Sequence, residues 1–201
     1  MNTVPGPILP LVAISTTAGT GSEVSGASVL ADTANQCRGS ILSNFIRPAV
    51  AIYDPLLTLS CPPVVTADAG IDALTHAVEG FICTWHTDIT DGLCLNAARE
   101  IFQHLPAAYE ASLSNNPTQE RFQNARGKMH NAATSAGLGF GNAMASLAHA
   151  MGHVLGSVYH IPHGRAVGLC LPYTIEFAAR GEDSSRIELL TELLGLSEGG
   201  G

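Results

Sequence analysis

Residues 70–80 read GIDALTHAVEG, and this stretch decides how the fold is predicted. Its apolar residues recur at the spacing of a helix with one buried face. Asp72 and His76 stand four residues apart, so a helix places both side chains on one face, one turn from each other. Such a pair can hold one metal ion, but by itself it is more often a surface pair or a capped core histidine. The stretch predicts a helix and leaves the role of the pair open.

A second stretch, LAHAMGHVLGSVYHIPHG at 147–164, gathers four histidines among apolar residues. His149 and His153 repeat the four-residue spacing, and His163 follows at a predicted turn, with His160 shortly before it. A buried neutral histidine without a partner leaves polar nitrogens unsatisfied, and coordination to a metal would resolve that. Three imidazoles with one carboxylate suit Zn²⁺ or Fe²⁺ better than Mg²⁺ or Ca²⁺, which prefer oxygen ligands. Spacing alone does not decide between metal ligands and ordinary core histidines.

The remaining histidines and the cysteines show weaker evidence of metal binding or disulfide bonding. His86, His104 and His130 stand among polar residues, which predicts surface or boundary positions. The cysteines form no CxxC pair, so we expect a reducing compartment and small buried side chains rather than a disulfide framework. The cysteines are Cys37, Cys61, Cys83, Cys94 and Cys170.

Two regions of the chain differ in residue type and in the spacing of their apolar residues. Up to about Cys61 short apolar runs rich in Val, Ile and Thr alternate with turn residues, which predicts strands. After Pro63 the apolar spacing becomes helical. The predicted strands are 11–16, 25–32, 38–43 and 48–55, and the predicted helices are 66–82, 90–105, 117–137, 142–158, 164–179 and 184–195. We expect a mainly α chain with a β-containing part at 1–61 and an all-helical part at 62–201.

Composition narrows the class of protein and of partner. The chain has 201 residues, 46% of them hydrophobic and 13% charged, as folded globular proteins do. Its formal charge of −8 argues against nucleic acid or an anionic membrane, which need a basic face. No apolar run is long enough to cross a bilayer, and the start MNTVPGPILP lacks the positive region of a secretory signal. A cytoplasmic protein is expected.

Four stretches together resemble the iron-containing (group III) alcohol dehydrogenases. They are ISTTAGTGSEV at 14–24, PAVAIYDPLLTLSCPP at 48–63, GIDALTHAVEGF at 70–81 and LAHAMGHVLGSVYHIPHG at 147–164. Members of that family have a dehydroquinate synthase-like fold, in which an N-terminal α/β nucleotide-binding domain joins a helical domain across the active-site cleft. The resemblance implies a helical metal-binding domain preceded by a short β-containing remnant of the nucleotide-binding domain.

The resemblance also assigns roles to the histidines. The family's metal aspartate falls on Asp72, and its histidine ligands fall on His76, His149 and His163. Its non-ligand histidine near the nicotinamide, implicated in proton relay, falls on His153. The implied cofactors are one divalent metal, Fe²⁺ or Zn²⁺, and NAD or NADP.

Further residues match dinucleotide-contacting positions of the family. Thr16, Thr17 and Thr20 of TTAGT match residues near the phosphates and the nicotinamide, where hydroxyls and exposed N–H groups suit a phosphate. Leu57 matches a residue that packs near the cofactor. Arg38 stands where the family often has a cofactor-contacting lysine.

The chain is about half as long as a full-length member and lacks the GGGS phosphate-binding turn and the helices after about Gly195. We therefore expect a fragment, or a chain whose exposed strands a partner covers, with a homo-oligomer as one option. The implied function is metal-dependent, NAD(P)-linked oxidation of an alcohol to an aldehyde or ketone, which is reversible. The alternative is a non-catalytic metal-binding fragment of such a dehydrogenase that cannot bind the dinucleotide alone.

Overall fold

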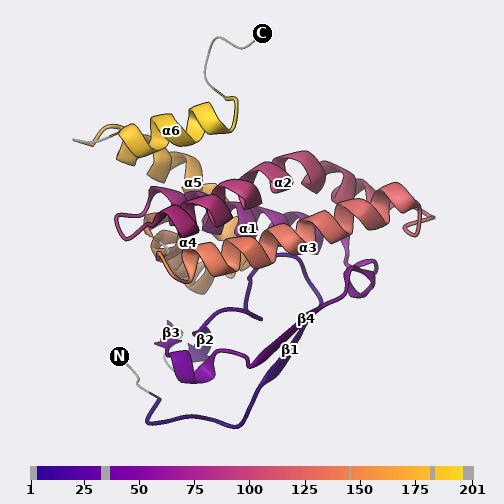
Figure 1. The fold of residues 1–201 in the computed structure, drawn as a ribbon, viewed down its shortest axis with the longest axis horizontal. Helices are drawn as coiled ribbons and strands as arrows, with labels where there is room; N and C mark the ends of the chain where they lie inside the picture. Colours follow the sequence, from indigo (N-terminus) through magenta and orange to yellow (C-terminus); the bar gives the residue numbers. More distant parts are fainter. Residues whose placement is uncertain (1–3, 33–36, 145, 182–183, 197–201) are drawn as a thin grey trace.

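The computed structural model describes residues 4–32, 37–144, 146–181 and 184–196, and it is mainly helical (Figure 1). Within these residues four strands and two short 3-10 helices precede six α-helices. The predicted mainly α fold is confirmed. None of the described helices is long and apolar enough to cross a membrane.

The strands form two separate two-stranded sheets, and each strand lies close to a predicted strand. β1 (Val12–Ser15) pairs in parallel with β4 (Val50–Tyr53), and β2 (Ala27–Asp32) pairs antiparallel with β3 (Cys37–Leu42). The 3-10 helices follow as η1 (Asn44–Ile46) after β3 and η2 (Pro55–Thr58) after β4. Because β1 and β4 are parallel, the segments that follow them lie at the same edge of their sheet.

The helices gather on one side of the strands, with α6 on the far side of the group (Figure 1). They are α1 (Pro63–Ile82), α2 (Asp88–Leu113), α3 (Glu120–Phe140), α4 (Leu147–Val158), α5 (His163–Ala179) and α6 (Ser185–Leu193). α1 packs against α2, α3 and α5, and α4 packs mainly against α5. α1 is therefore the helix around which the others are arranged.

Alanines fill the contacts among the first three helices, and each is at most 2% exposed. They are Ala73 and Ala77 of α1, Ala97 and Ala98 of α2, and Ala125, Ala132, Ala133 and Ala136 of α3. Small side chains let helices approach closely, and close packing leaves a core little freedom to rearrange. Cys61, Cys83, Cys94 and Cys170 are free thiols, with Cys94 and Cys170 buried and Cys61 and Cys83 partly buried.

The predicted end of the second helix at Leu105 is wrong, because α2 continues through Pro106 to Leu113. Proline removes a backbone donor and usually kinks or ends a helix. Here Ala108 and Ala111, beyond the proline, are each 1% exposed. Their burial in the helical core favours continuation over termination.

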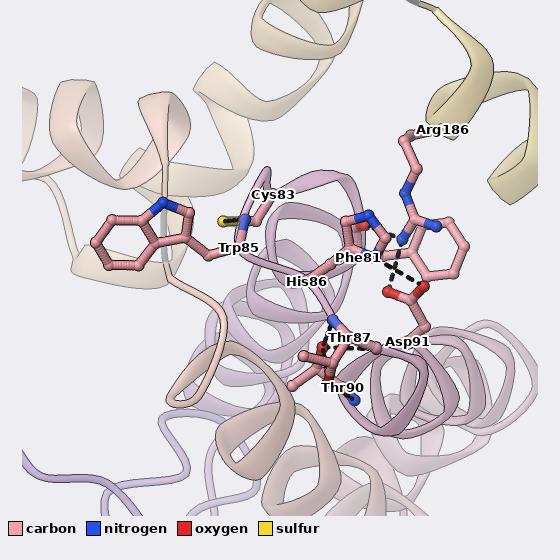
Figure 2. Close-up of polar contacts among 8 residues, drawn as sticks. All are labelled: Phe81, Cys83, Trp85, His86, Thr87, Thr90, Asp91 and Arg186. Atoms are coloured by element: carbon pink, nitrogen blue, oxygen red, sulfur yellow. Dashed lines mark hydrogen bonds and ion pairs between the residues drawn. The ribbon is translucent and has the colours of Figure 1, made fainter.

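The junction of α1, α2 and α6 is held by a set of polar contacts (Figure 2). Arg186 of α6 donates to the carbonyl oxygen of Phe81 and, over 2.6 Å, to Oδ1 of Asp91 at the start of α2. Its guanidinium carbon lies 4.1 Å from the centre of the Phe81 ring. His86, partly buried as a boundary residue, lies with Nδ1 3.1 Å from Oδ2 of Asp91. Arg186 thus links α6 to both α1 and α2.

The prediction that His130 is a surface or boundary residue is wrong, since its side chain is 0% exposed. Its ring meets the Tyr53 ring edge-on, with centroids 5.5 Å apart. Burial lowers the pKa of His130 despite the opposing negative charges of Glu23 and Asp54. The polar sequence neighbours, such as Lys128, misled the prediction because a helix turns them to a different face.

Candidate metal centre and dinucleotide loop

Helix α1 supplies the first two predicted ligands from its buried face. Asp72 is 2% exposed and His76 is 5% exposed. Their four-residue spacing places the two side chains one turn apart, so both point into the same packed space. The helical pair predicted from the sequence is therefore an interior pair and not a surface one.

α4 and α5 bring two further predicted ligands to the same place. Nε2 of His149 lies 3.7 Å from Oδ1 of Asp72, and Nε2 of His163 lies 3.4 Å from the same oxygen. One ligand atom each from Asp72, His76 and His149 lies within 4.8 Å of the other two. The structure thus gathers the four residues that the sequence singled out, from three helices.

Ring stacking holds the imidazole of His76 in place. One face lies against Phe140, with centroids 3.9 Å apart and planes 6° apart. Another contact is with His149, at 4.4 Å and 16°. A ring packed in this way has little freedom to turn, so its nitrogens keep their direction. Phe140, at the end of α3, was not predicted as part of the site.

His153 and His163 complete the histidine group. His153 lies one turn after His149 on α4 and is partly buried, and its ring centroid is 5.0 Å from that of His163. His163 is the first residue of α5 rather than part of a turn. His160, the remaining histidine of the stretch, is exposed and has a positive φ of 54°.

The start of α5 is fixed against α1 beside the group. Arg165 makes two contacts with the carboxylate of Asp68, Nε to Oδ1 at 3.2 Å and Nη2 to Oδ2 at 3.3 Å. A Cβ at Gly164 would lie 1.9 Å from the carbonyl oxygen of Asp68, so only glycine permits this approach. Because Gly164 follows His163, this contact sets how near that histidine comes to Asp72.

Asp72, His76 and His149 each have one buried side-chain atom for which the residues that the structure describes provide no hydrogen-bond partner. These atoms are Oδ1 of Asp72, Nδ1 of His76 and Nε2 of His149. Leaving buried polar atoms unsatisfied is costly, and each such group in a native protein needs an explanation. The three side chains each offer one ligand atom within 4.8 Å of the other two, so a cation bound between the side chains would relieve part of that cost. The donor set, imidazoles with one carboxylate, fits Zn²⁺ or Fe²⁺.

The electrostatics favour the metal-binding forms of Asp72 and His76. Burial alone would raise the pKa of Asp72, but the neighbouring histidines outweigh it and lower that pKa. Burial lowers the pKa of His76 to about 3. Burial also acts to lower the pKa of His149, but the carboxylates of Asp72 and Glu79 raise it to about 9. At neutral pH Asp72 would therefore offer a metal a carboxylate and His76 a neutral imidazole, whereas His149 would have to lose one proton to bind it.

Sequence reasoning missed Glu79, which is 1% exposed and contacts His149. Glu79 stands three residues after His76 and seven after Asp72, and these spacings place all three on one helix face. The helical periodicity that linked Asp72 and His76 was the signal that would have found it.

Four of the five predicted dinucleotide residues lie at one edge of the β1–β4 sheet. Thr16, Thr17 and Thr20 follow β1, and Leu57 lies in η2, just after β4. Thr16 and Thr20 are exposed and Thr17 is partly buried. Arg38 is a residue of β3, but its side chain is outside the described part of the structure.

Glycines let this loop lie directly on the helices. A Cβ at Gly19 would lie 2.8 Å from Cβ of Ala69, which stands one turn before Asp72 on α1. Gly21 has φ of +59°, and a Cβ there would lie 2.5 Å from Cα of Gly137 on α3. A further contact comes from Glu23, which accepts a hydrogen bond of 2.7 Å from Thr134.

Comparison with known proteins decides the family. A model of the Fe-containing alcohol dehydrogenase family, C-terminal part, matches residues 66–200, which is more than half of the chain. The chain belongs to the iron-containing alcohol dehydrogenases. A second model, of iron-containing alcohol dehydrogenases, matches residues 2–55. The resemblance inferred from the four sequence stretches is therefore confirmed.

Relatives of this iron-containing alcohol dehydrogenase chain extend well beyond it. A 1-propanol dehydrogenase from Citrobacter freundii is 43% identical over 169 residues, 84% of this chain and 44% of the relative. The structure of an alcohol dehydrogenase from Oenococcus oeni is 35% identical, with a TM-score of 0.87 over 96% of this chain and 49% of that one. A sulfoacetaldehyde reductase from Bifidobacterium kashiwanohense in complex with NAD⁺ is 34% identical, with a TM-score of 0.78 over 94% and 53%. The chain spans about half the length of these relatives.

Proposed function

We propose that Asp72, His76, His149 and His163 hold one divalent metal in an NAD(P)-linked alcohol dehydrogenase that interconverts an alcohol and an aldehyde or ketone. The observation that supports this most is the convergence of ligand atoms of Asp72, His76 and His149, buried side chains that each hold an unsatisfied polar atom, in a chain of this family. A bound Zn²⁺ or Fe²⁺ would supply a Lewis acid that polarises an alcohol oxygen and lowers the pKa of its hydroxyl.

The protein groups shape that site by charge and by rigidity. Asp72 brings the one negative charge among the four ligands, so a loaded site keeps a net positive charge that favours an anionic substrate oxygen. The stacked His76 ring and the tethered start of α5 hold their ligands with little freedom to move. Ligands fixed in advance give the geometry that a functional site requires.

His153 is proposed as the group that moves the substrate proton. Its ring lies next to His163, and its side chain is only partly buried, so it connects the histidine group with solvent. A histidine has an unperturbed pKa near neutrality and can accept a proton from a hydroxyl and return it to water. His153 therefore suits a relay role, while the four ligands suit metal binding.

The loop 16–20 is proposed to bind the dinucleotide, NAD or NADP. It follows the carboxyl end of β1, next to the segment after β4, and ligands of parallel α/β sheets bind outside the carboxyl ends of strands. The hydroxyls of Thr16, Thr17 and Thr20 and the loop N–H groups suit a phosphate. The contact of Gly19 with Ala69 places this loop one helical turn from Asp72.

Two variants test the assignment of the histidines. His163→Ala should abolish retention of Fe²⁺ or Zn²⁺, measured by elemental analysis of the purified chain, whereas His153→Ala should keep the metal. Loss of metal from the His153→Ala variant would contradict the assignment. Alcohol-dependent reduction of NAD⁺ and NADP⁺ should be assayed with the metal-loaded wild-type chain. Metal at one per chain without nicotinamide binding would limit this chain to the metal-binding part of the enzyme.

A further inference from the structure

Glu79 is a buried carboxylate that none of the roles above uses. Its side chain comes from α1, is 1% exposed and accepts from three donors at the start of α4. The backbone N–H of Ala148 donates to Oε1 at 2.6 Å, and that of Ser146 donates to Oε2 at 3.0 Å. Nδ1 of His149 lies 2.5 Å from the same Oε2. Both carboxylate oxygens are thus occupied by the segment that carries a predicted metal ligand.

Two of these contacts fix the first turn of α4. The first N–H groups of a helix lack partners within the helix, and a negative charge there is favoured by the helix dipole. Glu79 supplies both the acceptors and the charge from a neighbouring helix. Because Asp72 and His76 come from the same helix as Glu79, the distance between the α1 ligands and α4 depends on this carboxylate.

The third contact decides which nitrogen of His149 is available. A carboxylate accepts and does not donate, so Nδ1 of His149 carries the proton in this contact. The ring's other nitrogen, Nε2, is then the one that faces Oδ1 of Asp72, 3.7 Å away. Metal-binding histidines commonly donate their second N–H to a carboxylate, which fixes the tautomer and the direction of the ring.

We propose that Glu79 is a positioning residue for the metal site, because it holds α4 against α1 and fixes His149 with its proton on Nδ1 and Nε2 directed at the metal. This inference rests on the proposed function, since it assigns the partner of one proposed ligand. A purely structural role as a helix cap would stabilise α4 without changing how tightly the metal is held.

Glu79→Gln separates the two roles. Glutamine keeps the size of the side chain but replaces one acceptor oxygen by an NH₂ donor, so it cannot accept from all three donors at once. We expect Zn²⁺ affinity, measured by competition with a chromophoric chelator, to fall roughly 10–100-fold, as for other partners of metal-bound histidines. The matched control is Ser146→Ala, which removes the hydroxyl that accepts from the N–H of Leu147 at the same helix end. This control should lower the melting temperature of the metal-free chain and leave Zn²⁺ affinity unchanged.

Wild-type Zn²⁺ affinity in Glu79→Gln would overturn the proposal while leaving the metal site itself intact. Failure of the wild-type chain to bind Zn²⁺ would overturn the proposed function and this inference together. If Glu79→Gln does not fold, ¹⁵N spectroscopy of the Zn²⁺-loaded wild-type chain decides instead. It should show the proton of His149 on Nδ1 and the metal on Nε2, and the reverse arrangement would overturn the role of Glu79.

Discussion

The helical group around α1 and the strand region hold their functional residues in different ways. On α1, the side chains of Asp72 and His76 are at most 5% exposed and lie among packed helices. In the β1–β4 sheet, by contrast, Val12 is 53% exposed and Ile14 is 56% exposed, and the threonine loop is held by contacts with α1 and α3. Burial within the chain fixes Asp72, His76 and His149, whereas the strands keep apolar surface available for further contacts. We therefore expect metal binding to depend on packing around α1 and to be insensitive to changes in the strands.

The largest expected effect is loss of the metal from a variant in the helical group. His76→Ala removes one of three convergent ligand atoms, so Zn²⁺ affinity should fall by more than the roughly 10–100-fold typical of outer-shell partners. Val12→Thr, which replaces an exposed side chain of β1 with one of nearly the same size, should keep wild-type affinity. Competition with a chromophoric chelator measures both. Equal affinities for the two variants would remove the distinction between the regions.

A methyl group added at a glycine tests packing in the two regions. Gly164→Ala places Cβ 1.9 Å from the carbonyl oxygen of Asp68, so α5 must move from α1. We expect a loss of about 1–3 kcal/mol in the free energy of unfolding, as for other overpacked sites, measured by urea denaturation. Gly39→Ala in β3 meets nothing within 4 Å and should be nearly neutral. A Gly164→Ala chain as stable as the wild type would mean that the α1–α5 contact is looser than described.

His130 lies between the two regions, packed on Tyr53 of β4, and its burial predicts a pH effect. Because the pKa of His130 is lowered in the folded chain, the unfolded chain takes up the proton first as the pH falls. Its contribution is fully present above the unfolded pKa of about 6.5 and is lost below it, by up to about 1.4 kcal/mol per pH unit until the folded pKa is reached. His130→Phe should make unfolding free energy, measured by urea denaturation from about pH 8 to about pH 5, less dependent on pH. An unchanged slope in that variant would show that His130 is solvated in the folded chain.

The smallest expected effect concerns α6, which is remote from the strands. Arg186→Met removes the contacts with Asp91 and Phe81 that tie α6 to α1 and α2. The loss in stability should be about 1 kcal/mol, since the ion pair is partly exposed and the cation–π contact is modest. Hydrogen exchange should show faster opening of α6 amides than of α1 amides. Equal acceleration in α1 would mean that α6 supports the whole helical group.

Much of this fold and site follows from periodicity, and the exceptions have physical causes. Helical spacing located α1 and the pair of Asp72 and His76, and alternating apolar runs located the four strands of the described residues. The predicted second helix ended at Leu105, just before Pro106. In the structure α2 continues to Leu113, because residues after the proline are buried. Composition around His130 said nothing of its burial, because that depends on which helix face meets β4.

The site was predictable to the extent that residue type reveals chemistry. Imidazoles and a carboxylate at helical spacing suggested ligands, and the resemblance selected among them. The contacts of Glu79 with α4 join residues about 70 positions apart in sequence, and no local pattern records such a pairing. The stacking of His76 on Phe140 likewise depends on how α3 ends against α1.

The proposed function requires that imidazoles and a carboxylate hold one metal between α1, α4 and α5. X-ray absorption spectroscopy at the zinc K edge of the Zn²⁺-loaded chain tests it most directly. We expect a first shell of nitrogen and oxygen at about 2.0–2.1 Å, with the outer-shell scattering of three histidine rings and no sulfur. Sulfur at about 2.3 Å, or a shell without histidine scattering, would contradict it.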